Sequence, residues 1–380
     1  MRSLMIEPKN NEPSDLAKKE EAILQFWREN KIFEQSLTKS APRGDFVFYE
    51  GPPTANGRPG IHHIEARAFK DIIPRFRTMQ GYRVARRAGW DTHGLPVELE
   101  VEKQLGLKSK KEIEQYGLVA FNQRCRDSVW KYLTDWRQFT ERIGFWIDQD
   151  HPYVTYEPRY IESVWSIIKH AADRGLLYQD YKVVPWCPRC GTALSSHELA
   201  QGYTEVTATA VYVKFELVND PGTYFLAWTT TPWTLPGNVA LAVNPNLEYA
   251  LVQAANSKYI LLASLVSKLF TTETVRVIST VPGRELVGQK YHPLFSSLAD
   301  NLPPAEKNKL PNAFQIYPAD FVSAEEGTGI VHTAVMYGVD DFALGTAVGL
   351  PKYHLVAEDG RFKPEVKLWA GQLVNDASPL

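Results

Sequence analysis

Cysteine is scarce in this sequence, with only three residues among 380. So few thiols exclude the disulfide framework of a small secreted domain. No stretch approaches the ~20 apolar residues of a membrane-spanning helix, and the first ten residues lack an apolar run of signal-peptide length. These absences predict a cytoplasmic protein that has no membrane partner.

An excess of one charge is also missing, because 42 lysine and arginine residues stand against 44 aspartate and glutamate residues. Composition therefore neither supports nor excludes a nucleic-acid partner, which needs only local basic surface. The basic clusters at residues 83–87 and 108–111 are more simply explained as solvated faces. What is present is ample core material, since 44% of the residues are hydrophobic and the length allows two or three domains.

The first 200 residues carry mostly helical patterns. We expect an amphipathic helix over residues 15–36, a capping box at Ser109 and Glu112, and one long helix over residues 118–142. A further helix over residues 159–174 should end at Gly175. Cys125 lies in the apolar stripe of the long helix, which predicts an inert, buried thiol.

After about residue 201 the pattern changes to short strands. Residues 211–217 alternate with period two, and residues 249–253 and 259–262 flank a predicted hairpin turn at 254–257. Frequent glycine, proline and asparagine breaks favour a β-barrel-like domain. We therefore place a domain boundary between residues 1–200 and 201–380.

The segment from Glu50 to Ile64 has the pattern of a nucleotide-binding loop. An apolar strand at residues 46–49 leads through a Gly/Pro-rich loop into a helical pattern with apolar residues at 61, 64, 68, 72 and 73. Glycines in the loop let a ligand approach the backbone, and the first helical turn offers free amide donors. His62 and His63 lie in that turn, where imidazoles can donate hydrogen bonds to phosphate oxygens.

A pair of histidines is by itself more simply explained as surface polarity. A second loop, residues 89–96, strengthens the nucleotide-site hypothesis, because it follows a strand-like segment at residues 82–85. Loops after neighbouring strands form the usual ligand crevice of an open α/β sheet. Asp91 would supply the negative charge that a substrate ammonium needs.

These two segments together resemble the isoleucyl-tRNA synthetases of class I. The resemblance implies an α/β fold: the first half of a Rossmann-like catalytic domain, preceded by a helix and followed by half of a zinc ribbon, and then an inserted editing domain. It implies an isoleucine–tRNA ligase that uses ATP with Mg²⁺, isoleucine and tRNA(Ile), acting as a monomer. By this resemblance isoleucine binds Gly51, Pro52 and Asp91, ATP binds Asn56, Gly57, Gly60, His62 and His63, and the last three are catalytic.

One position departs from the family pattern. The usual signature is His-x-Gly-His, whereas this sequence has Gly60-Ile61-His62-His63, so the first and third residues are exchanged. A bacterial variant of the family carries this exchange and is associated with resistance to an antibiotic that mimics the isoleucyl adenylate. An intact surrounding loop favours a functional variant over an inactive site.

Cys187 and Cys190 have the spacing of a zinc knuckle. A four-ligand site needs two more ligands, so a redox pair or a fortuitous turn stays open as an explanation. In the family a similar segment forms half of a zinc ribbon, whose other ligands would lie beyond residue 380.

Two segments in the second half resemble the editing site of the isoleucyl, valyl and leucyl synthetases, although a threonine run alone is more often a sign of β-propensity. An apolar isoleucine pocket cannot strongly reject valine, because one methylene is worth only ~1–3 kcal/mol, a value for which the isoleucyl enzymes are themselves the standard example. The resemblance implies that Asp341 binds the ammonium of misattached valine and that a threonine-rich strand faces a Gly-Thr-Gly segment. The residues that would shape the pocket are Thr230, Thr231, Thr234, Asn238 and His332.

The sequence shows no Lys-Met-Ser-Lys-Ser-like loop, no second set of parallel strands and no helical anticodon-binding region. We therefore expect an N-terminal part of such a ligase. Two alternatives remain: a free-standing hydrolase of misacylated tRNA, which would not need the nucleotide loop, and a non-catalytic paralogue that binds nucleotide or tRNA.

Overall fold

The computed structural model describes residues 14–54, 56–200, 202–271 and 275–378. The chain forms two compact units, residues 1–179 and residues 180–380. The division comes before the boundary expected at residue 200, so the short hairpin around the cysteines belongs to the second unit. Among the described residues, no helix is long and apolar enough to cross a membrane.

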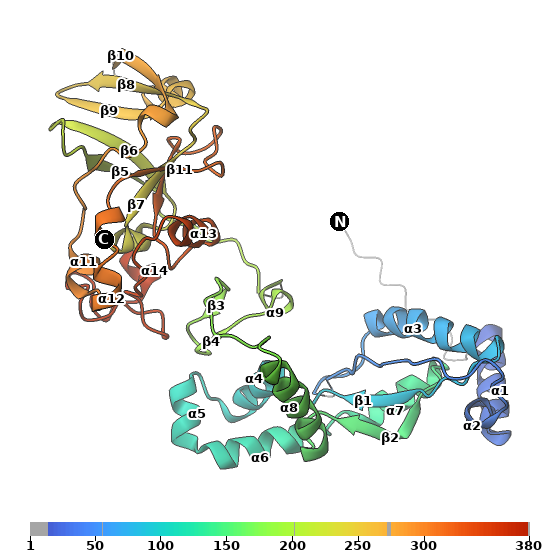
Figure 1. The fold of residues 1–380 in the computed structure, drawn as a ribbon. Coiled ribbons are helices and arrows are strands. Elements are labelled where there is room, and N and C mark those ends of the chain that lie inside the picture. The colour runs from blue at the N-terminus through green and yellow to red at the C-terminus, as the bar shows by residue number, and fades with distance from the viewer. Residues whose placement is uncertain (1–13, 55, 201, 272–274, 379–380) are drawn as a thin grey trace, which may run out of the picture. The chain divides into compact units, whose positions relative to one another are not determined.

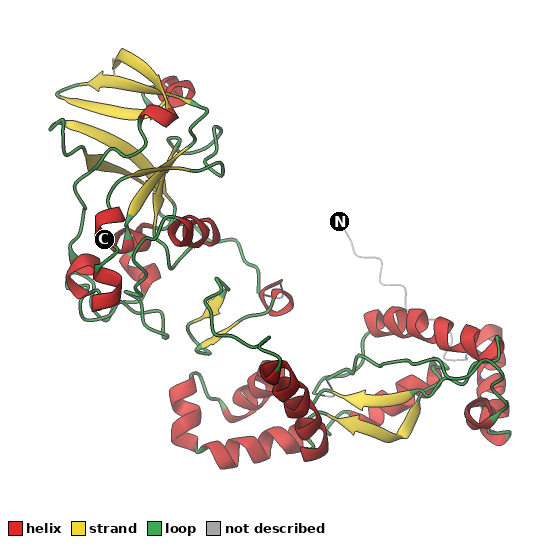
Figure 2. Cartoon of the chain, in the orientation of Figure 1, coloured by secondary structure: helices red, strands yellow, loops and turns green. Residues whose placement is uncertain are grey.

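Unit 1 is mainly helical around a pair of parallel strands (Figures 1 and 2). Its elements are α1 (Asp15–Glu29), α2 (Ile32–Thr38), α3 (Ile61–Met79), β1 (Arg87–Trp90), α4 (Leu95–Leu105), α5 (Lys110–Tyr116), α6 (Leu118–Ser128), α7 (Leu133–Arg142), β2 (Asp148–Val154) and α8 (Pro158–Asp173). Strands β1 and β2 pair in parallel, with helices α4 to α7 in the connection between them. This arrangement confirms the mixed α/β character that the sequence predicted.

Gly89 in β1 lets the two strands approach each other. A Cβ atom at this position would lie 2.2 Å from the Tyr153 ring of β2. Because glycine leaves this space free, the ring crosses β1 and its hydroxyl donates to the Glu50 carbonyl at 2.6 Å. The lack of a side chain at Gly89 thus permits the hydrogen bond that links the strand pair to the loop that precedes α3.

Several predicted boundaries in unit 1 are wrong. Residues 46–49 form no strand; only single parallel bridges, Asp45 with Arg83 and Thr54 with Asp91, mark this segment. The strand expected at residues 82–85 begins instead at Arg87, so the first residues of the predicted loop 89–96 belong to β1.

Two predicted helices are each divided in two. The helix over residues 15–36 ends at Asn30, whose side-chain amide donates to the Phe26 carbonyl at 2.9 Å, and Lys31 then has a φ of 49°. The helix over residues 118–142 is interrupted between Ser128 and Leu133. The apolar stripe continues through this second break, because Val129 is fully buried there.

Other helical predictions in unit 1 are confirmed. The Ser109 hydroxyl caps α5 by accepting from the Glu112 N–H at 3.3 Å, and α8 ends just before Gly175, which has a φ of 67°. Cys125 packs against the cluster around Phe121, and burial raises the pKa of its thiol to about 11. The raised pKa keeps this thiol protonated, but the side chain is half-buried rather than buried as predicted.

Unit 2 is rich in strands. They are β3 (Trp186–Cys187), β4 (Thr192–Ala193), β5 (Val211–Glu216), β6 (Thr223–Thr229), β7 (Ala240–Val243), β8 (Glu248–Ala254), β9 (Ser257–Leu262), β10 (Val275–Pro282), β11 (Ile316–Pro318) and β12 (Ile330–Thr333). The helices are α9 (Ser196–Ala200), α10 (Val266–Leu269), α11 (Ser297–Asn301), α12 (Pro304–Lys307), α13 (Val339–Ala347) and α14 (Val374–Ala377). The predicted strands and the hairpin turn after Ala254 are confirmed.

The main strands of unit 2 form two open sheets, ordered β10-β8-β9-β6-β5 and β11-β7-β12 (Figures 1 and 2). Within the described ranges neither sheet closes on itself, so the single barrel expected from the sequence is not seen. An apolar core lies among the strands of both sheets and includes Phe215, Phe225, Leu241 and Ile330. This core supports the segments that carry the second candidate site.

Candidate functional site

The first candidate site begins where α3 starts. Gly60 is the N-cap residue, and its backbone N–H donates to Nδ1 of His63 at 2.8 Å. His63 therefore accepts at Nδ1, so a neutral ring carries its proton on Nε2. Burial, and then the neighbouring His62, lower the pKa of His63 and favour this neutral form. The exposed His62 ring lies close by, tilted by 42° to the His63 ring, with 3.8 Å between the ring centroids.

The loop before α3 is attached to two helices. The side-chain amide of Asn56 donates to the Pro96 carbonyl in α4 at 3.0 Å. In α7, the indole N–H of Trp136 donates to the Gly57 carbonyl at 2.8 Å, and its ring lies edge-to-face with His63 at 4.7 Å. These contacts attach the predicted ATP-binding loop to α4 and α7.

The predicted isoleucine-binding residues are also brought together. The Asp91 N–H donates to the Pro53 carbonyl at 3.0 Å, so Asp91 lies beside the loop that carries Gly51 and Pro52. On α3, Lys70 pairs with the buried Glu50 and donates to the Gly51 carbonyl at 3.1 Å.

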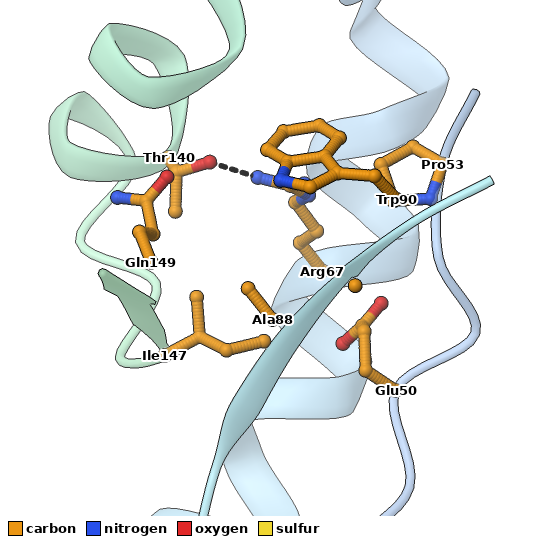
Figure 3. A pocket seen from close by; sticks show the side chains of 9 residues that line it. Glu50, Pro53, Arg67, Ala88, Trp90, Thr140, Ile147 and Gln149 are labelled. Atoms are coloured by element: carbon orange, nitrogen blue, oxygen red, sulfur yellow. Dashed lines mark hydrogen bonds between the residues drawn. The ribbon is translucent and has the colours of Figure 1, made fainter. Parts of the chain in front are cut away.

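A cavity of about 10 Å³ lies beneath this loop, lined by Glu50, Arg67 and Trp90 among others (Figure 3). Arg67 comes from α3, is buried, and hydrogen-bonds to the Thr140 hydroxyl (Figure 3). Its guanidinium also lies 5.0 Å from the centre of the Trp136 ring. The buried Arg67 guanidinium thus occupies the base of the site, which is not an open pocket.

The exchanged signature has a direct geometric basis. A Cβ atom on Gly60 would lie 2.8 Å from Cε1 of His62, so the His62 ring occupies the space next to the Gly60 backbone. A side chain on residue 60 would require the exposed His62 ring to adopt another rotamer. The two exchanged positions are therefore sterically coupled.

The second candidate site lies at the end of β6. The expected threonine-rich strand ends at Thr229, so Thr230 and Thr231 follow it and are exposed, while Thr234 lies in the 3₁₀ helix Pro232–Gly237. The threonine-rich strand thus ends earlier than the segment that the sequence singled out, because the prolines at 232 and 236 favour a turn.

The Gly-Thr-Gly segment does pack against this region. A Cβ atom on Gly327 would lie 3.0 Å from the Trp228 ring of β6, and the Leu262 N–H donates to the Thr328 carbonyl at 2.8 Å. The segment therefore runs beside strands β6 and β9.

Three of the predicted editing residues form one buried hydrogen-bonded cluster. His332 bonds through Nε2 to the Thr234 hydroxyl at 2.7 Å and through Nδ1 to the side-chain amide of Asn238 at 3.2 Å. Burial lowers the pKa of His332 to about 4. The imidazole is therefore neutral at ordinary pH, and both of its nitrogens have partners inside the protein.

Asp341 lies in the first turn of α13. Its Oδ1 accepts from the Ala334 N–H at 2.7 Å, which holds it beside the end of the strand that carries His332. A Cβ atom on Gly338 would approach Oδ2 of Asp341 to 2.1 Å, so the glycine makes room for the carboxylate. Burial raises the pKa of Asp341, and the Ala334 hydrogen bond opposes this effect.

The two cysteines of the predicted zinc knuckle lie on the β3–β4 hairpin. The Cys190 N–H donates to Sγ of Cys187 at 3.4 Å, and burial raises the pKa of Cys190. In the part of the chain that the structure describes, no group of three or more histidine, cysteine or acidic residues could hold a metal ion.

Sequence reasoning missed residues that the structure places at both sites. Trp136 and Lys70 hold the first loop, and Tyr291 donates to Asn238 at 2.6 Å in the second cluster. The sequence gives no local signal for them, because each lies some 20 to 80 residues from its partner.

Comparisons with known proteins agree with the motif-based resemblance. Residues 22–339 match the model of the class I tRNA synthetases (I, L, M and V). Isoleucine–tRNA ligase of Clostridium kluyveri is 47% identical over 95% of this chain and 34% of its own length. The Thermus thermophilus ligase is 50% identical over 92% of this chain and 33% of its own length. Isoleucine–tRNA ligase 2 of Bacillus thuringiensis subsp. konkukian is 46% identical over 94% of this chain and 34% of its own length.

Likeness to solved structures is weaker. The leucyl-tRNA synthetase editing domain of P. falciparum aligns at 18% identity and a TM-score of 0.26, over 32% of this chain and 44% of that one. A TM-score this low carries no argument. The chain spans about a third of the length of the curated relatives that it matches. The family match covers most of the chain, and the chain belongs to the class I tRNA synthetases of the isoleucine, leucine, methionine and valine group.

Proposed function

We propose that this chain carries the amino acid- and ATP-binding half of an isoleucine–tRNA ligase, together with its editing site. The observation that carries the proposal is the fixed loop at the start of α3, where the His63 ring is held by Gly60 and the loop passes beside Asp91. Identities of 46–50% to isoleucine–tRNA ligases support isoleucine as the amino acid.

In the proposed reaction a carboxylate oxygen of isoleucine attacks the α-phosphorus of ATP. A new oxygen–phosphorus bond forms, and the bond to the pyrophosphate leaving group breaks. Mg²⁺ accompanies ATP and screens the phosphate charge. The substrate is itself the nucleophile, so the protein contributes positioning and electrostatic stabilisation.

His63 suits the electrostatic part of this role. Because Nδ1 accepts from the Gly60 N–H, Nε2–H is free to donate to a phosphate oxygen. The first turn of α3 adds backbone N–H donors. Asp91 would bind the isoleucine ammonium, and the aminoacyl group would then pass from AMP to a hydroxyl of tRNA(Ile).

ATP–pyrophosphate exchange with isoleucine by the full-length gene product tests this function. His63→Ala should lower the exchange rate strongly, since a lost electrostatic donor commonly costs about 10²–10³ in rate. His170→Ala is the matched control, because His170 is exposed on α8 and its ring bonds to the Ser166 carbonyl of its own helix. Equal activity of the two variants would contradict the role of His63.

We further propose that the second site hydrolyses misattached valine. The buried cluster of Thr234, Asn238 and His332 supports a rigid wall, and Asp341 supplies a carboxylate beside the end of the strand that carries His332. Hydrolysis of valyl-tRNA(Ile), compared with isoleucyl-tRNA(Ile), tests this role. Equal rates on both substrates would contradict an editing site.

Cys187 and Cys190 would supply half of a tetrahedral zinc site, since two thiolates from one tight turn are a common half-set of ligands. The β3–β4 hairpin holds the two thiols together, with the Cys190 N–H donating to Sγ of Cys187 at 3.4 Å. Zinc content of the full-length gene product, measured with and without Cys187→Ser, tests this half-site. Equal zinc content in the parent and in Cys187→Ser would contradict the proposed half-site.

A further inference from the structure

The cluster around His332 extends to a residue outside the predicted site. Tyr291 is almost fully buried, and its hydroxyl lies 2.6 Å from Oδ1 of Asn238. Asn238 lies 53 residues away along the chain, and its amide nitrogen approaches both the Ala240 carbonyl, at 2.9 Å, and Nδ1 of His332. Four side chains therefore form one continuous series: Tyr291, Asn238, His332 and Thr234.

The Ala240 carbonyl determines how the Asn238 amide is oriented. A carbonyl oxygen accepts only, so the group that faces it must be the NH₂ of Asn238. The other hydrogen of this NH₂ then points to Nδ1 of His332, which must accept. Oδ1 of Asn238 faces the opposite way and accepts from the Tyr291 hydroxyl.

The hydrogen bonds of Thr234 also indicate which nitrogen of His332 carries the proton. Thr234 has one hydroxyl hydrogen, and it donates this hydrogen to the Thr231 carbonyl at 2.8 Å. The Thr234 oxygen must therefore accept from Nε2–H of His332, 2.7 Å away. Both ends thus require the same tautomer, with the proton on Nε2.

We propose that Tyr291 is a positioning residue of the second site: through Asn238 it holds His332 as the Nε2–H tautomer, and the ring orients Thr234. In this arrangement His332 is a hydrogen-bond donor and does not take a proton from water. The term second site rests on the proposed editing function, whereas the tautomer is a property of the folded chain alone.

Removing the Tyr291 hydroxyl would weaken the preference of His332 for the Nε2–H tautomer. In Tyr291→Phe, Oδ1 of Asn238 is buried without a partner, which is costly. If the Asn238 side-chain amide flips instead, its Oδ1 faces the Ala240 carbonyl. In that orientation Oδ1 can accept a hydrogen bond from a proton on Nδ1 of His332. The flip is opposed by the contact between two carbonyl oxygens and by loss of the Thr234 bond to the Thr231 carbonyl, so the ring should populate the Nδ1–H tautomer in part beside the Nε2–H tautomer.

Tyr249→Phe provides a matched control. Tyr249 is equally buried in the same apolar cluster, and its hydroxyl donates to the Gly329 carbonyl at 2.7 Å. This variant also removes a buried hydroxyl but does not touch Asn238. A general loss of packing or stability would affect both variants alike.

The first test is ¹⁵N NMR of the histidine rings in the 380-residue chain, with His332 assigned from a His332→Gln variant. We expect one Nε2–H tautomer in the parent and in Tyr249→Phe, and a mixture with the Nδ1–H tautomer in Tyr291→Phe. An Nδ1–H tautomer in the parent, or an unchanged tautomer in Tyr291→Phe, would overturn the proposal.

The second test is valyl-tRNA hydrolysis by the full-length gene product. Tyr291→Phe should lower kcat about tenfold with little change in KM, because Thr234 loses its fixed orientation while the tRNA-binding surface is intact. Unchanged kcat would overturn the positioning role. Absence of hydrolysis by the parent would contradict the editing function, and the NMR result would then decide the tautomer on its own.

Discussion

The two candidate sites use histidine in different surroundings. In unit 1 the His62 ring is exposed and His63 is half-buried, and His63 accepts at Nδ1 from the Gly60 N–H. In unit 2 His332 is buried and both of its ring nitrogens are bonded to neighbouring side chains. The hydrogen bonds of His63 thus involve one ring nitrogen, whereas those of His332 involve both. Substitutions in the second should therefore affect stability and function together.

Asn238→Ala should have the largest effect of this kind. It leaves the Tyr291 hydroxyl, Nδ1 of His332 and the Ala240 carbonyl without the bonds that they make to Asn238. With ~1–3 kcal/mol for each unsatisfied buried group, we expect a loss of at least about 3 kcal/mol in the free energy of unfolding, measured by urea denaturation.

The matched control in unit 1 is Asn56→Ala. Asn56 is only half-buried and makes one side-chain bond, to the Pro96 carbonyl. Its loss should cost about 0.5–1.5 kcal/mol. Similar losses in the two variants would remove the distinction between the sites.

The pH dependence of stability should come next. The pKa of His332 is about 4 in the folded chain and about 6.5 when unfolded, so between these values the unfolded chain binds more protons. The stability from the neutral ring is fully present above about pH 6.5 and is lost as pH falls towards 4. At 1.36 kcal/mol per pH unit the loss is about 3 kcal/mol. His332→Gln should flatten this part of the profile, and an unchanged profile would place the effect elsewhere.

Substitutions of Asp341 test binding of the ammonium group at the second site. Asp341→Ala should slow valyl-tRNA hydrolysis roughly 10- to 150-fold, the equivalent of ~1.5–3 kcal/mol for a hydrogen bond to a charged group. Adenylate formation should stay near normal. Asp341→Asn keeps an acceptor for the Ala334 N–H but removes the charge, so it separates ammonium binding from the structural bond. Parent-like hydrolysis by Asp341→Asn would mean that another residue binds the amine.

The smallest effect concerns the exchanged signature. Gly60→His alone should clash with His62, and adding His62→Gly should relieve the clash, giving a coupling of about 1 kcal/mol in ATP binding. The double variant should also bind an isoleucyl-adenylate mimic more tightly, because glycine again gives access to the backbone. Additive effects, or unchanged affinity for the mimic, would show that the exchange does not determine inhibitor binding.

Local patterns explain which features could be predicted from the sequence. The start of α3 after Gly60, the cap at Ser109 and the hairpin after Ala254 depend on neighbouring residues, and all three are confirmed. The break after Ser128 could not be predicted, because the apolar pattern continues through it. Trp136 was likewise missed, since its bond to Gly57 depends on how distant helices pack.

The long-range attachment by Trp136 also has an entropic consequence. A flexible loop must lose conformational freedom when it closes on a nucleotide, and this loss weakens the measured affinity. Here the indole of α7 and the Asn56 amide restrain the loop as soon as unit 1 folds. If the proposed nucleotide site is correct, much of the ordering cost of binding is transferred to folding, and Trp136 of α7 contributes to affinity through the loop.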